Sequence, residues 1–128
     1  MRLLLDTATF LWAVLDSPRL SPQARELLVD PGNEPFLSVV SSWEIAVKYS
    51  AGRLPLPESP ELFLAQERQR LGVAVLPLEE EAALYTARLP RLHLDPFDRM
   101  LICQAIVHGL TVLTPDEAIS QYPIRVLW

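Results

Sequence analysis

Four acidic residues occur where a predicted helix begins. Asp6 directly follows the apolar run "LLL", and Glu44, Asp98 and Asp116 occur in "SSWE", "DPFDRM" and "TPDE". Each position suits an acid that caps backbone N–H groups at a helix start. Carboxylates gathered at one place would instead repel one another unless a divalent cation binds there, because carboxylate oxygens are preferred ligands of Mg²⁺ and Mn²⁺. Helix capping and metal binding are both open at this point.

The segment "HLDPFDRM" places two of the acids three residues apart. Asp95 immediately precedes Pro96, which predicts that Asp95 is the N-cap of a helix and has mainly a structural role. Asp98 lies one turn inside that helix and on the same side, so its carboxylate can point past the helix end toward Asp6.

Two further segments predict helix caps. In "SSWE", Ser41 and Glu44 have the spacing of a Ser-x-x-Glu capping box. In "TPDE", Thr114 is predicted to cap a short helix, with Asp116 in the first turn. Thr114 and Thr7 could equally donate a hydrogen bond to a neighbouring carboxylate.

Apolar periodicity, prolines and glycines predict an alternation of strands and helices. Strands are expected at residues 2–5, 36–38, 73–78, 111–113 and 124–128, and helices at 7–15, 22–29, 41–50, 60–71, 79–89, 96–108 and 115–120. This order predicts an α/β fold with a mainly parallel sheet and helices on both faces. The carboxyl ends of such strands share one edge, where ligands bind, so the acids are expected to converge on one crevice.

Length and composition set the remaining limits. A chain of 128 residues, half of them apolar, predicts a single domain over residues 1–128. The one cysteine, Cys103, lies in an apolar run, and the apolar run at the N-terminus is too short for a signal peptide or a membrane span, so we expect a cytoplasmic protein. The formal charge of −5 argues against a general nucleic-acid-binding surface.

The segments "LLLDTATFLWA", "SSWEIAVKYSAGRL", "HLDPFDRMLICQA" and "LTPDEAISQYP" resemble, in order and spacing, the PIN-domain family. They resemble in particular its VapC-like toxin ribonucleases of toxin–antitoxin pairs. The resemblance implies an α/β/α sandwich and a quartet of acids that binds one or two Mg²⁺ or Mn²⁺ ions. Those acids fall on Asp6, Glu44, Asp98 and Asp116, with Asp95 as an accessory acid.

The resemblance also implies partners. They are a single-stranded RNA substrate, a second copy of the chain in a homodimer, and a small antitoxin that covers apolar helix surface and reaches the acidic crevice with a basic side chain. The helix at 60–71 either forms part of that surface or packs on the protein's own sheet. Lys48 and Arg99 could contact RNA phosphates, although Lys48 also has helical ion-pair spacing to Glu44 and Arg99 could lie on a solvated face.

The chemistry expected of these acids is metal-assisted phosphodiester hydrolysis. Two divalent ions would bring the formal charge from −5 to about −1, which reduces the electrostatic repulsion between the protein and RNA phosphates. A haloacid-dehalogenase-like phosphatase needs a second Asp where this chain has Ala8, and a receiver domain needs an acidic pair where Asp6 is followed by Thr7. Two alternatives stay open: a PIN-like housekeeping RNA-processing nuclease, and an inactive interaction module whose acids only cap helices.

Overall fold

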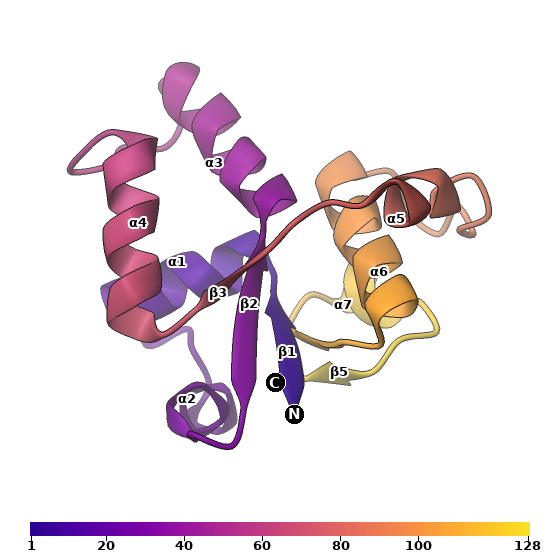
Figure 1. Cartoon of the computed structure of the whole chain (residues 1–128), viewed down its shortest axis with the longest axis horizontal. Helices are drawn as coiled ribbons and strands as arrows, with labels where there is room; N and C mark the ends of the chain where they lie inside the picture. Colours follow the sequence, from indigo (N-terminus) through magenta and orange to yellow (C-terminus); the bar gives the residue numbers. More distant parts are fainter.

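A computed structural model describes residues 1–128, and its centre is one five-stranded sheet (Figure 1). The strands are β1 (Arg2–Leu5), β2 (Glu34–Ser38), β3 (Ala74–Leu76), β4 (Thr111–Leu113) and β5 (Val126–Leu127). Their order across the sheet is β3-β2-β1-β4-β5, and every neighbouring pair is parallel. The predicted mainly parallel sheet is therefore confirmed.

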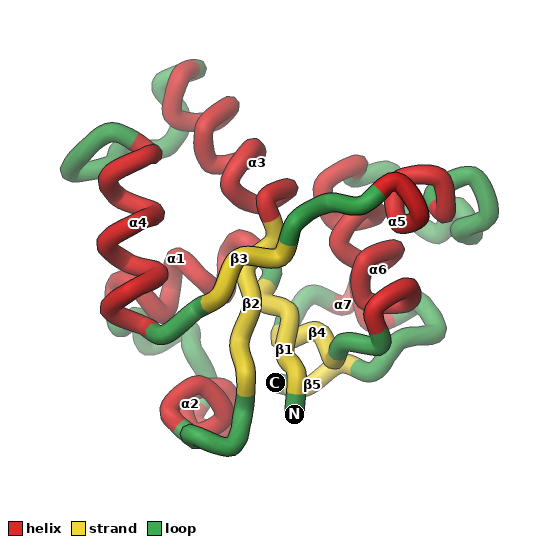
Figure 2. The backbone as a smooth tube through the Cα atoms, viewed as in Figure 1, coloured by secondary structure: helices red, strands yellow, loops and turns green.

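Seven helices surround the sheet. They are α1 (Thr7–Leu15), α2 (Pro22–Val29), α3 (Val39–Ser50), α4 (Pro60–Leu71), α5 (Glu80–Tyr85), α6 (Pro96–His108) and α7 (Glu117–Ser120). Figure 2 shows α1, α2 and α4 on one side of the strands and α5, α6 and α7 on the other, with a loop that crosses from β3 to α5. None of these helices has the length and apolarity needed to cross a membrane.

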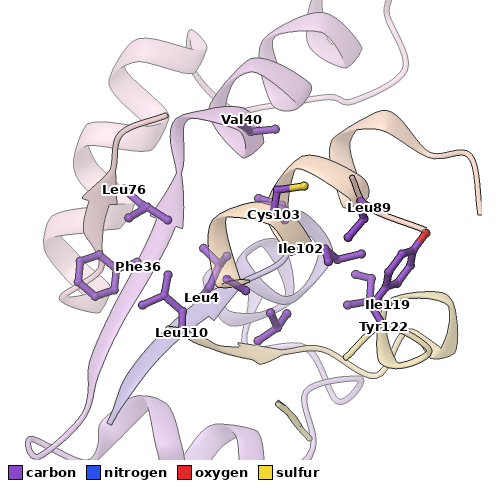
Figure 3. Close-up of a cluster of buried hydrophobic side chains, with 13 residues drawn as sticks. Leu4, Phe36, Val40, Leu76, Leu89, Ile102, Cys103, Leu110, Ile119 and Tyr122 are labelled. Atoms are coloured by element: carbon purple, nitrogen blue, oxygen red, sulfur yellow. The ribbon is translucent and has the colours of Figure 1, made fainter. Parts of the chain in front are cut away.

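The central strand β1 is buried on both faces, because parallel strands covered by two helix layers have no solvent side. Leu4 is in register with Phe36 and Val112, and the three belong to a core cluster that also contains residues of α6 and α7 (Figure 3). Leu5 points to the opposite face and packs with Leu37 in a second cluster. The sheet therefore holds the carboxyl end of β1 rigidly between two cores.

Helix α3 begins earlier than the sequence pattern predicts. Its N-cap is Ser38, whose hydroxyl accepts a hydrogen bond from the Val40 N–H, because the chain turns into the helix directly at the end of β2. Ser41 is buried inside the helix, so the predicted capping box of Ser41 and Glu44 is wrong. Glu44 therefore lies one turn further into α3 than the capping box implied.

The cap of α7 also differs from the prediction. Asp116 itself is the N-cap, and its Oδ1 accepts from the Ala118 N–H at 2.9 Å. Thr114 lies outside the helix because its hydroxyl is engaged with Asp6. Helix α5 ends at Tyr85, earlier than expected.

Helix α6 confirms its prediction in detail. Asp95 is its N-cap, Pro96 is the first helical residue, and the Asp95 Oδ1 accepts from the Asp98 N–H at 3.0 Å. Gly109 ends the helix in a left-handed conformation with φ of 65°, which a side chain would disfavour. Cys103, in the middle of α6, is buried, and burial raises the pKa of its thiol.

Candidate active site

Asp6 lies at the carboxyl end of β1 and caps α1. Its Oδ1 accepts from the Thr9 N–H at 2.8 Å, and its Oδ2 accepts from the Thr114 hydroxyl at 2.5 Å. Burial raises the pKa of Asp6, and the hydrogen bonds from Thr114 and Thr9 oppose that rise. Both hydrogen-bond donors are neutral, so they hold the carboxylate in place without cancelling its charge.

Thr114 joins Asp6 to Asp116. While its hydroxyl donates to Asp6, its Oγ1 accepts from the Asp116 N–H at 3.0 Å. The two acids are close enough that the charge of Asp116 contributes to the raised pKa of Asp6. The adjacent strands β1 and β4 thus bring two of the predicted acids to one edge of the sheet.

Asp98 reaches the same region from the first turn of α6. Burial raises its pKa to about 6, and the negative charges of Asp95, Asp116 and Asp6 add to the effect. The Nε2 of His93 lies 3.3 Å from Asp98 Oδ2, and this hydrogen bond opposes the rise. Three of the four predicted acids are therefore within electrostatic reach of one another.

Glu44, the fourth predicted acid, has its own set of partners. Its Oε1 accepts from the Thr7 hydroxyl at 2.6 Å, and its Oε2 pairs with the Lys48 ammonium at 2.5 Å. Thr7 directly follows Asp6, so the first turn of α1 connects Glu44 to the other acids. Glu44 already has a cationic partner, and its charge is not among those that shift the pKa of Asp6 or Asp98.

The chemistry of this donor set fits a divalent cation. Neither Lys nor Arg forms an ion pair with Asp6, Asp98 or Asp116, and the basic side chain that contacts them is His93, at Asp98. Hard oxygen donors therefore share one region without a permanent positive charge beside them. No three His, Cys, Asp or Glu side chains are already close enough together to hold a metal ion. To share one ion, these carboxylates must therefore come closer together than they lie in this structure.

Arg99 has contacts that differ from those expected of an RNA-binding residue. Its Nη1 donates to the Pro90 carbonyl at 2.8 Å, and its Nη2 donates to the Leu89 carbonyl at 3.3 Å. The guanidinium thus fastens the loop before α6. The sequence did not single out Tyr122, which contacts both Arg99 and His93, because no local pattern marks a tyrosine that meets them across the fold.

Comparison with known proteins assigns the family. The PIN-domain family matches residues 3–124, which is nearly the whole chain. This chain belongs to the PIN-domain family. The sequence is also similar to ribonuclease VapC16 of Mycobacterium tuberculosis, with 35% identity over 66 residues. That match spans 48% of this chain and 47% of the relative.

Solved structures share the fold. The structure resembles VapBC2 from Rickettsia felis bound to a DNA fragment from its promoter, with a TM-score of 0.75, 18% identity, and coverage of 99% and 98% of the two chains. It also resembles DNA-bound VapBC from Salmonella typhimurium, with a TM-score of 0.69, 21% identity, and coverage of 99% and 97%. The PIN fold predicted from the four motifs is therefore confirmed.

The raised pKa of Asp98 predicts a pH-dependent stability change. Between the ordinary pKa of 3.8 and about 6 the folded protein holds a proton that the unfolded chain has lost, so folding stability falls as pH rises through this window. Asp98→Asn removes the penalty. In metal-free buffer at pH 7.5 we expect the variant to be about 1–3 kcal/mol more stable than the wild type, and nearly equal at pH 4. Urea unfolding at both pH values measures this difference.

Asp95 supplies the matched comparison, because its carboxylate caps α6. Asp95→Asn keeps a capping oxygen, whereas Asp95→Ala removes it, so the Ala variant should be less stable than the Asn variant by about 0.5–2 kcal/mol. A stability gain in Asp98→Asn of equal size at pH 4 and pH 7.5 would contradict the electrostatic explanation.

Proposed function

We propose that this chain is a metal-dependent endoribonuclease that cleaves single-stranded RNA and acts as the toxin of a toxin–antitoxin pair in the cytoplasm. One observation carries the proposal: Asp6, Asp98 and Asp116 converge at the carboxyl edge of the sheet without a cationic partner from Lys or Arg. Membership of the PIN-domain family and the similarity to ribonuclease VapC16 support it.

Asp6, Asp98 and Asp116 would hold Mg²⁺ or Mn²⁺, with Glu44 as the fourth acid. When bound, such a cation supplies the water activation and charge neutralisation that phosphodiester hydrolysis requires. The residues around the acids orient the carboxylates. Thr114 and the Thr9 N–H fix both oxygens of Asp6, and Thr7 fixes one oxygen of Glu44.

Lys48 is our candidate for contact with the RNA backbone. Its ammonium pairs with Glu44, but its side chain is 42% exposed and can turn toward a phosphate. Since Glu44 is nearly buried, movement of Lys48 would free a carboxylate oxygen at the site. RNA binding and the availability of Glu44 would then be coupled.

The proposed antitoxin has an apolar surface available beside α4. A cleft of about 480 Å³ lies between α1, α2 and the end of α4, lined by Ala13, Leu28 and Leu71 among others. Phe63 is the buried residue of α4, whereas Leu62 is 55% exposed. Helix α4 thus packs on the protein's own core through Phe63, and its exposed Leu62 supports the proposal that a partner covers part of this helix.

For the proposed homodimer, α3 offers an exposed apolar stripe. Val39, Trp43 and Val47 recur every four residues, which places them on one face of the helix. The Trp43 side chain is 62% exposed and contacts the Phe97 ring edge-on at 5.0 Å between centroids. This stripe can bury apolar area against a second copy of the chain.

RNA cleavage tests the proposed activity. The purified protein should cleave single-stranded RNA with Mg²⁺ or Mn²⁺ and stop when EDTA is added. Asp98→Asn should lower the cleavage rate by orders of magnitude, because one carboxylate for the cation is lost, whereas Asp95→Asn should lower it less. The rates are measured on a labelled RNA with each variant folded.

Glu26→Gln is the control for charge alone, because Glu26 is an exposed acid on α2 away from the site. It should cleave as the wild type does. Cleavage that continues unchanged in EDTA would refute the metal mechanism. A protein whose melting temperature does not rise with Mn²⁺ would instead be an interaction module with capping acids.

Hydrogen exchange tests the antitoxin surface. In a complex with its antitoxin, α4 and the end of α1 should exchange more slowly than in the free toxin, because the partner covers the cleft between them. Mass spectrometry of both forms measures this, with helix α5, on the other side of the strands (Figure 2), as the internal reference. A complex in which α4 exchanges as fast as in the free protein would rule out this surface.

A further inference from the structure

The hydroxyl of Tyr122 is the centre of a buried polar network beside Asp98. Tyr122 is only 3% exposed, and its ring packs in the core with Ile119 and Leu89 (Figure 3). Its oxygen lies 2.8 Å from the Nδ1 of His93, 3.2 Å from the backbone N of His93 and 3.1 Å from the Nη1 of Arg99. The other ring nitrogen of His93, Nε2, lies 3.3 Å from Asp98 Oδ2.

We propose that His93 is a positioning residue for Asp98, held by Tyr122 and Arg99 in the tautomer that carries its proton on Nε2. The role in cation binding rests on the function proposed above, whereas the tautomer follows from hydrogen bonding alone. No cationic group takes part in the final contact to the carboxylate.

Counting donors and acceptors gives the tautomer. A backbone N–H and an arginine N–H can only donate, so both must donate to the Tyr122 oxygen. The hydroxyl proton of Tyr122 then has one acceptor among its partners, Nδ1 of His93. A neutral imidazole that accepts at Nδ1 carries its proton on Nε2, and this N–H points to Asp98.

Arg99 keeps this arrangement fixed. It holds the Leu89 and Pro90 carbonyls as well as the Tyr122 hydroxyl, so the loop that carries His93 is tied to α6, the helix that carries Asp98. Arg99 therefore sets the position of His93 relative to Asp98 in two ways, through the backbone of the loop and through the Tyr122 hydroxyl. These hydrogen bonds occupy the Arg99 guanidinium, the group predicted to contact RNA.

The consequence for Asp98 is a defined orientation. His93 occupies Oδ2, and the structure shows no hydrogen bond to Oδ1. One oxygen is thus anchored and the other is free to face the group formed by Asp6 and Asp116. Partners that orient a metal-binding carboxylate in this way typically change metal affinity by about 10- to 100-fold when they are removed.

Nitrogen-15 NMR of the histidine rings tests the tautomer directly. At pH 7.5, the wild-type His93 should show a protonated Nε2 and an unprotonated Nδ1. Tyr122→Phe removes the hydroxyl proton and should convert His93 to a mixture of the two tautomers. A protonated Nδ1 in the wild type would overturn the proposal, and this spectrum decides the tautomer even if the Tyr122 variant does not fold.

A pair of His93 variants tests the positioning role. The amide nitrogen of Gln reaches about as far as Nε2, whereas that of Asn reaches only as far as Nδ1. Calorimetric Mn²⁺ titration should therefore give His93→Gln an affinity within about threefold of the wild type, and His93→Asn a loss of about 10- to 100-fold. Equal affinities of folded Gln and Asn variants would overturn the positioning role.

The two proposals fail in different ways. If the wild type binds no Mn²⁺ and cleaves no RNA, the proposed function is refuted, together with the positioning role of His93 toward a cation. The tautomer is still decided by the wild-type NMR spectrum, which requires neither metal nor RNA.

Discussion

The hydrogen bond from the Thr114 hydroxyl to Asp6 joins the carboxyl ends of β1 and β4, and the arrangement of the acidic residues depends on this hydrogen bond. It connects residues 108 positions apart in the chain across two adjacent parallel strands. The same hydroxyl accepts from the Asp116 N–H, so one threonine sets both the direction of the Asp6 carboxylate and the start of the chain into α7. The two buried cores on either side of β1 hold the strand ends that carry this hydrogen bond.

Helix capping and metal binding are compatible roles for the same acid. Asp6 and Asp116 each use Oδ1 to cap a helix, which fixes the side chain and leaves its charge in place. Asp95 also caps a helix, and the hydrogen bond that it accepts from the Asp98 N–H fixes the first turn, from which Asp98 faces the site. The caps hold like charges near one another, and burial together with these neighbouring charges raises the pKa of Asp98 to about 6.

Sequence reasoning recovered the features that local chemistry encodes. The alternation of strands and helices, the Asp95 cap and the end of α6 at Gly109 all follow from patterns a few residues long. The missed features depend on contacts across the fold. Ser38 rather than Ser41 caps α3, because β2 ends at Ser38. Thr114 does not cap α7, and its hydroxyl donates to Asp6 instead. The hydrogen bond from Thr7 to Glu44 and the network around Tyr122 are tertiary features of the same kind.

We propose that Asp6, Asp98 and Asp116 share one divalent cation at the carboxyl edge of the sheet. Paramagnetic broadening by substoichiometric Mn²⁺, followed on assigned backbone amide signals by NMR, tests it most directly. We expect the signals of residues 6–9, 98 and 114–118 to broaden first and together, while those of α2 and of the acidic start of α5 stay sharp. Broadening that begins at α5 or spreads evenly over exposed acids would contradict a shared cation at Asp6, Asp98 and Asp116.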